Sequence, residues 1–77
     1  MDIKILGSGC PKCRTLEANT RKALEEMGLD ANITKVTKIS DITEYGVMMT
    51  PSLVINEKVV SSGKVLSPAE IKNFLKN

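Results

Sequence analysis

Histidine and tryptophan are absent from this 77-residue sequence, which has a single Phe and a single Tyr. Without histidine, neither a Cys–His catalytic pair nor a Cys₂His₂ zinc site can form. With so few aromatic side chains the hydrophobic core must be aliphatic, and no row of aromatic residues is available for single-stranded nucleic acid to stack on. These absences leave the two cysteines as the main candidates for chemistry.

Long apolar runs and a strong excess of either charge are also missing. Eleven basic and nine acidic side chains give a net charge of +2, too balanced to indicate a nucleic-acid or membrane partner. No apolar run is long enough for a transmembrane helix, and the start of the chain does not resemble a secretion signal. We therefore expect one domain over residues 1–77, monomeric and cytoplasmic. In a reducing cytosol, a close cysteine pair is more often catalytic or metal-binding than structural.

Cys10 and Cys13 lie three positions apart at the start of a predicted helix. This spacing puts both residues on one face of the first turn, close enough for a disulfide. Pro11 suits the first helical position, so Cys10 stands at the N-cap, where unpaired backbone N–H groups favour thiolate over thiol. Lys12 and Arg14 add positive charge nearby. The pattern predicts a lowered pKa for Cys10 and a nucleophilic role.

The rest of the chain alternates between strand-like and helix-like patterns. Strands are predicted at 2–6, 31–36, 52–55 and 58–61, and helices at 11–27, at about 41–45 and from 68 onward. Ser67 and Glu70 match a capping box at the last helix, and Asp41 and Glu44 match the same pattern at the second. The first strand, helix and second strand form a βαβ unit, which predicts parallel pairing with a right-handed crossover.

This element order, with Cys-Pro-Lys-Cys after the first strand and Thr50-Pro51 before the third, resembles the thioredoxin fold. More narrowly, the chain is similar to the small thioredoxin- and glutaredoxin-like redox-active disulfide proteins of archaea and bacteria. The resemblance covers essentially the whole chain. It implies an α/β fold of βαβ-α-ββα order, with a four-stranded mixed sheet flanked by helices. It also implies that Pro51 is cis and faces the cysteines, that the Thr50 backbone pairs with an extended substrate, and that Pro11 and Lys12 support the site.

The function implied by this resemblance is a thiol–disulfide oxidoreductase that reduces or exchanges protein disulfides. No cofactor is expected beyond the redox-active disulfide of Cys10 and Cys13. In the hypothesised mechanism, the Cys10 thiolate attacks a substrate disulfide, and the more shielded Cys13 then attacks Cys10 and releases the reduced substrate. A flavin-dependent thioredoxin reductase is the electron donor that the resemblance suggests.

Several positions depart from the family pattern. Gly9 stands where thioredoxins usually have Trp, and Pro11-Lys12 replaces their usual Gly-Pro. Their buried acid would fall near Lys4, so the sequence does not identify a proton acceptor. The Gly-Gly-Asp loop with which glutaredoxins hold glutathione is matched only by Ser-Gly-Lys at 62–64. The missing acid weakens the case for glutathione as the partner.

Two other functions stay open from the sequence. Small heavy-metal-associated domains also carry Cys-x-x-Cys after their first strand, and soft Cu(I) could bind two thiolates. Those domains end in a strand, however, whereas Ile71, Phe74 and Leu75 form a helical apolar stripe near the end of this chain. A redox sensor, whose disulfide changes its affinity for a partner protein, would use the same cysteine chemistry.

Overall fold

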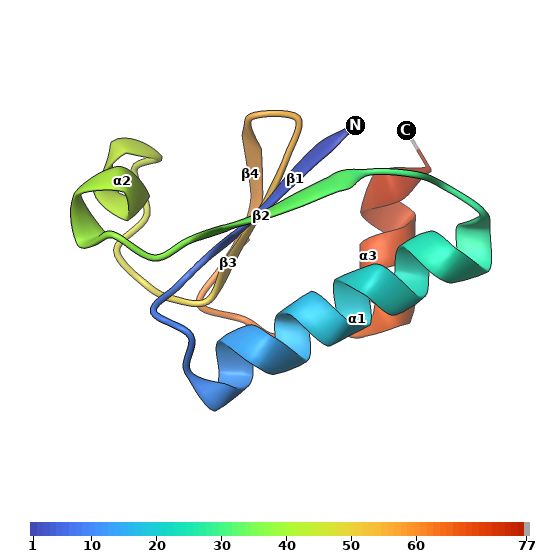
Figure 1. The fold of residues 1–77 in the computed structure, drawn as a ribbon, viewed down its shortest axis with the longest axis horizontal. Coiled ribbons are helices and arrows are strands. Elements are labelled where there is room, and N and C mark those ends of the chain that lie inside the picture. The colour runs from blue at the N-terminus through green and yellow to red at the C-terminus, as the bar shows by residue number, and fades with distance from the viewer. Residues whose placement is uncertain (77) are drawn as a thin grey trace.

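The computed structural model describes residues 1–76, which form four strands and three helices (Figure 1). In chain order the elements are β1 (Asp2–Leu6), α1 (Pro11–Met27), β2 (Asn32–Val36), α2 (Ile39–Glu44), β3 (Ser52–Ile55), β4 (Lys58–Ser62) and α3 (Pro68–Leu75). The order and type of these elements confirm the α/β arrangement predicted from the sequence. Two strand ends differ by one residue, because β2 begins at Asn32 and β4 continues to Ser62.

The strands form one mixed sheet in the order β2-β1-β3-β4. β1 pairs parallel with β2 and antiparallel with β3, and β3 and β4 form an antiparallel hairpin. Asn56 and Glu57 join the hairpin with φ angles of 49° and 67°, the left-handed pair that a tight two-residue turn requires. The fold therefore matches the four-stranded mixed sheet that the family resemblance implies.

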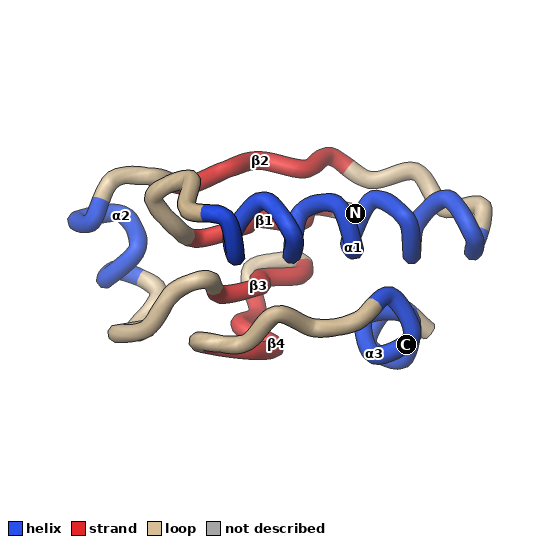
Figure 2. The backbone as a smooth tube through the Cα atoms, turned by 90° about the horizontal axis from the view of Figure 1, so that it is seen from below, coloured by secondary structure: helices blue, strands red, loops and turns tan. Residues whose placement is uncertain are grey.

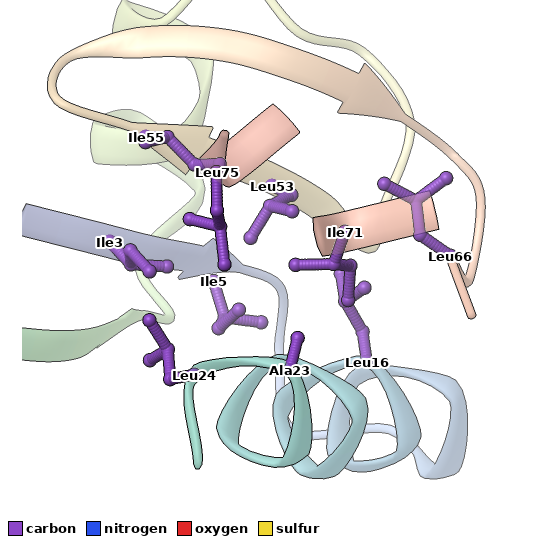
Figure 3. Packing of buried hydrophobic residues seen from close by; sticks show 10 residues of the cluster. All are labelled: Ile3, Ile5, Leu16, Ala23, Leu24, Leu53, Ile55, Leu66, Ile71 and Leu75. Atoms are coloured by element: carbon purple, nitrogen blue, oxygen red, sulfur yellow. The ribbon is translucent and has the colours of Figure 1, made fainter. Parts of the chain in front are cut away.

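Helices cover both faces of the sheet. α1 and α3 lie side by side on one face, whereas α2 lies on the other (Figures 1 and 2). Because side chains alternate along a strand, Ile3 and Ile5 of β1 face α1 and α3, and Leu6 faces α2. The larger core cluster, drawn in Figure 3, consists of Ile3, Ile5, Leu16, Ala23, Leu24, Leu53, Ile55, Leu66, Ile71 and Leu75. This core is aliphatic, as the composition predicts.

The ends of α1 and α3 are fixed by the local signals in the sequence. Cys10 is the N-cap of α1 and Pro11 its first residue, and Gly28 ends the helix with a φ of 66°. At α3, the Ser67 hydroxyl accepts from the Glu70 N–H at 3.2 Å, and the Glu70 carboxylate accepts from the Ser67 N–H at 3.1 Å. The predicted capping box of α3 is confirmed.

The predicted start of the second helix is wrong, and one residue of the predicted apolar stripe is not buried. α2 begins at Ile39 with Lys38 as its N-cap and no side-chain cap, so the capping box of Asp41 and Glu44 does not form. The helix starts earlier because the Lys38 carbonyl accepts the Ile42 N–H, which places Asp41 inside the first turn. Phe74 is 41% exposed, because α3 turns Ile71 and Leu75 toward the core and leaves Phe74 at the edge.

Candidate active site

The two cysteines meet at the first turn of α1. Cys10, at the N-cap, is partly exposed, whereas Cys13 is buried with 5% of its surface exposed. Their Sγ atoms lie 2.6 Å apart as free thiols, and the Cys13 N–H points at the Cys10 sulfur at 3.4 Å. A disulfide can therefore close within the turn without movement of the helix.

The surroundings shift the pKa values of these two thiols in opposite directions. The hydrogen bond from the Cys13 side chain is the main cause of a lowered pKa for Cys10, followed by the bond from the Cys13 backbone N–H. Burial is the main cause of a raised pKa for Cys13, followed by its contact with Cys10. The exposed sulfur thus ionises first, and the buried sulfur keeps its proton.

Gly7, which follows β1, is packed directly against Cys13. A Cβ atom added to Gly7 would collide with the Cys13 sulfur and would lie 3.8 Å from Cβ of Thr50. The Gly7 N–H donates to the Val36 carbonyl at 2.9 Å, which ties this turn to the end of β2. The sequence predicted no separate role for Gly7. A glycine shortly before the cysteine motif is nevertheless a signal that another group packs closely against the backbone there.

The Thr50–Pro51 segment reaches the same end of the sheet. The peptide bond between these residues is cis, the form that the family resemblance implies. Pro51 is buried, and its carbonyl accepts from the Gly63 N–H at 2.9 Å. Thr50 is exposed, and within residues 1–76 its main chain takes no part in the hydrogen bonds that tie the loops together. Its backbone N–H and carbonyl thus have no main-chain partner among these loop bonds.

Exposed side chains surround the cysteine pair. Pro11, Lys12 and Arg14 lie on the solvent-facing side of the first turn of α1. In the part of the chain that the structure describes, Lys12 and Arg14 form no ion pair. Because both side chains are exposed, solvent and salt screen the electrostatic effect of their charges on Cys10.

Lys4 belongs to a different cluster. Its Nζ donates to the Tyr45 hydroxyl at 2.6 Å and forms an ion pair with Glu57, and both contacts raise the pKa of Lys4. Tyr45 packs with the residues under α2, the face of the sheet opposite to α1. Lys4 stands on β1 where the resemblance implies a buried acid. This position therefore provides no carboxylate near the cysteines.

A cavity of about 360 Å³ opens beside Cys13 between α1 and β2. Glu17 and Lys35 line it, and their charged groups form an ion pair at 3.2 Å. Glu17 also accepts from Arg21 at 2.9 Å, and this bond is the main cause of a lowered pKa for its carboxyl group. Sequence reasoning missed Glu17, although its position four residues after Cys13 puts both on one helix face.

Residues 1–76 contain neither a cluster of metal-binding side chains nor a membrane-spanning helix. No group of three or more His, Cys, Asp or Glu side chains in this part of the chain is placed to hold a metal ion. Over the same residues, no helix has the length and apolar content needed to cross a membrane.

Comparison with known proteins relates the whole of this fold to one family. A family model described as a thioredoxin domain matches residues 1–76. A protein named thioredoxin from Methanocaldococcus jannaschii is 45% identical over 75 residues, covering 97% of this chain and 86% of that relative. A thioredoxin from Methanothermobacter thermautotrophicus is 39% identical over 75 residues, covering 97% of each chain. The family match spans both the cysteine pair and Pro51.

Proposed function

This chain belongs to the thioredoxin family, and we propose that Cys10 and Cys13 carry its thiol–disulfide oxidoreductase activity. Proteins of this family act through a redox-active disulfide and need no separate cofactor. The observation that carries the proposal is the contact of the two sulfur atoms at 2.6 Å with unequal burial. One thiol can reach a substrate, and the other can reach only its neighbour.

The reaction proceeds in two exchanges. The Cys10 thiolate attacks one sulfur of a substrate disulfide, which forms a Cys10–substrate bond and releases the second substrate sulfur as a thiolate. Cys13 loses its proton and attacks Cys10, which forms the Cys10–Cys13 disulfide and releases the first substrate sulfur. The substrate gains two electrons, and the cysteine pair loses them.

Substrate alignment is assigned to the segment before β3. The main chain of Thr50, an exposed residue near Gly7, pairs with an extended stretch of the substrate, and the buried Pro51 fixes the position of this segment. Met48 and Met49, which are 96% and 62% exposed, supply adaptable apolar contacts next to it. Pro11 and Lys12, the first two residues of α1, support the helix start next to Cys10.

The partners are protein disulfides and a reductase such as thioredoxin reductase. Glutathione is a weaker candidate, because Lys64 stands where a glutathione-holding loop would need an acid. We place the protein in the cytoplasm, where a reducing environment returns the pair to its dithiol form, and expect it to act as a monomer. The metal-binding alternative is disfavoured by the fold, because α2 is followed by β3, β4 and α3 and not by the second β-α-β unit of the heavy-metal-associated domains.

Trapping with single variants tests the proposed roles. Each variant is mixed with a small protein that has an accessible disulfide, and free thiols are then blocked by alkylation before non-reducing mass analysis. Cys13→Ser is expected to accumulate a mixed disulfide through Cys10, whereas Cys10→Ser accumulates none. Equal trapping by both variants would overturn the assignment. A wild-type protein that binds such partners without reducing them would instead support the redox-sensor alternative.

A further inference from the structure

Cys13 and Glu17 line the same cavity, one helical turn apart on α1. We propose, building on the function above, that Glu17 accepts the Cys13 proton through cavity water in the second exchange, and that Lys35 holds the Glu17 carboxylate in place. The resolving cysteine needs such an acceptor because it is 95% buried and must lose a proton before it attacks. Lys4 is hydrogen-bonded to Tyr45 on the other face of the sheet, so it cannot accept the proton of Cys13.

The cavity gives Cys13 a path to this carboxylate. Residues four positions apart on a helix have Cβ atoms about 5–6 Å from each other, so Glu17 is the nearest acid along α1. The volume of about 360 Å³ exceeds the roughly 30 Å³ that one water molecule occupies in the liquid. A water chain can therefore connect the Cys13 sulfur to the Glu17 oxygens without exposing the sulfur to a bulky reagent.

The Glu17 carboxylate is held on two sides. Its side chain is only 14% exposed, its Oε1 contacts Lys35 of β2 at 3.2 Å, and its Oε2 contacts Arg21 of α1 at 2.9 Å. Arg14 is the remaining charged residue along the cavity wall, and the nearest β1 residue is Ile5. These surroundings, led by the bond from Arg21, keep the pKa of Glu17 below its usual value, so the carboxylate is ionised at neutral pH and holds the Cys13 proton only briefly before it passes the proton on.

The second exchange moves one proton and one electron pair. The S–H bond of Cys13 breaks, and its proton passes through water to a Glu17 oxygen. The Cys13 sulfur bonds to the Cys10 sulfur, the Cys10–substrate bond breaks, and the substrate sulfur leaves with the electron pair. Glu17 then returns the proton to solvent or to the departing thiolate.

The two exchanges can be timed separately with Ellman's reagent, a small aromatic disulfide that releases a coloured thiolate. Attack by Cys10 gives a first release that depends on reagent concentration, and attack by Cys13 gives a second release that does not. Glu17→Gln is expected to slow the second phase by about 100-fold at pH 7, the lower end of what a positioned acid or base contributes. The first phase should keep its wild-type rate. The slowing should fade at high pH, where hydroxide deprotonates Cys13 directly.

Two further variants separate proton transfer from a change in structure. Glu25→Gln, on the exposed face of the same helix, is the matched control and should leave both phases unchanged. Glu17→Asp keeps the carboxylate and should recover part of the lost rate. A second phase that Glu17→Gln leaves unchanged, or slows equally at every pH, would overturn this inference alone. Absence of a second phase in the wild-type protein would contradict the proposed function itself.

Discussion

The chemistry of this site depends on how differently two neighbouring thiols are treated. Cys10 sits at a helix end with hydrogen-bond donors around its sulfur, whereas Cys13 is one turn inward and is packed against Gly7. Hydrogen-bond donors favour the thiolate form of Cys10, whereas burial disfavours the thiolate form of Cys13. The two thiols therefore differ in pKa before a substrate binds. This difference in pKa between Cys10 and Cys13 can be tested by substituting single residues.

The pH dependence of alkylation measures this asymmetry. Only the thiolate reacts, so the lowered pKa of Cys10 means that its modification should be half-maximal at a lower pH than that of an ordinary cysteine. Cys13→Ala removes the leading hydrogen bond and should move the midpoint upward, while Cys13→Ser keeps a hydroxyl donor and should move it less. Mass analysis after brief exposure to iodoacetamide gives the profile. Identical midpoints in all three proteins would contradict the assigned cause.

Residues within one turn of each other were predictable from sequence, but those brought together by the fold were not. The N-cap position of Cys10 follows from the proline after it and from the spacing to Cys13. The ion pair between Glu17 and Lys35 joins α1 to β2, and no pattern within a helix predicts the partner on a strand. The position of Lys4 was noted as a departure, but its bond to Tyr45 depends on how α2 packs.

Helix ends set the geometry of the elements that carry the site. α1 presents Cys10 and Cys13, and α3 packs beside α1 to complete the core on that face. An ion pair between Lys72 and Glu26 joins the two helices at the surface. Since exposed ion pairs contribute little, the stability of α3 depends mainly on its buried face and on its N-terminal cap.

Removal of the α3 cap is expected to be measurable. Ser67→Ala leaves the Glu70 N–H without its side-chain acceptor and should lower the free energy of unfolding by about 1 kcal/mol, within a range of about 0.5–2. Ser40→Ala is the matched control, because α2 has no side-chain cap, and should change stability by less than about 0.5 kcal/mol. Urea unfolding followed by circular dichroism compares the two. An equal loss in both variants would contradict the role of the capping box.

The success of element prediction followed the strength of local signals. α3 carries a serine, a proline and a glutamate at cap positions, and its start was predicted correctly. α2 has no such cap and is held by Ile42 and Val47 packed against the sheet, so the sequence pattern placed its start too late. Spacing alone places Phe74 in the apolar stripe of α3, but the contact between α3 and α1 decides which residues of that stripe are covered.

At the scale of the whole molecule, one aliphatic cluster joins β1, β3, α1 and α3 (Figure 3). In a chain this short the surface buried on folding leaves only a narrow margin of stability. We propose that residues 1–77 unfold as a single domain, with Asn77 outside the described residues. The topology also explains the site, because β1 and β3 are neighbours and bring Gly7 and Thr50 to one end of the sheet. The family resemblance implies that Pro51 faces the cysteines, but it does not identify Gly7 as the residue that meets Thr50.

Truncation of the core tests the single domain. Ile71 is fully buried in α3, so Ile71→Ala should lower the free energy of unfolding by about 2–5 kcal/mol. Phe74→Ala, on the exposed edge of the same helix, should have a clearly smaller effect. Unfolding is followed both by circular dichroism and by the reactivity of Cys13, and the two transitions should coincide. Separate transitions would mean that the site end of the sheet unfolds independently of α3.

The most direct test of the account is a redox titration of Cys10 and Cys13 against defined dithiol–disulfide buffers. Free thiols are counted by their mass shift after alkylation, with Cys13→Ser as the variant that cannot form the disulfide. The proposed dithiol chemistry predicts a reversible two-electron couple in the wild-type protein, near the value of roughly −270 mV typical of thioredoxin. If no disulfide forms reversibly and the reduced protein instead retains a soft metal ion, the cysteine pair is a metal site and not a redox centre.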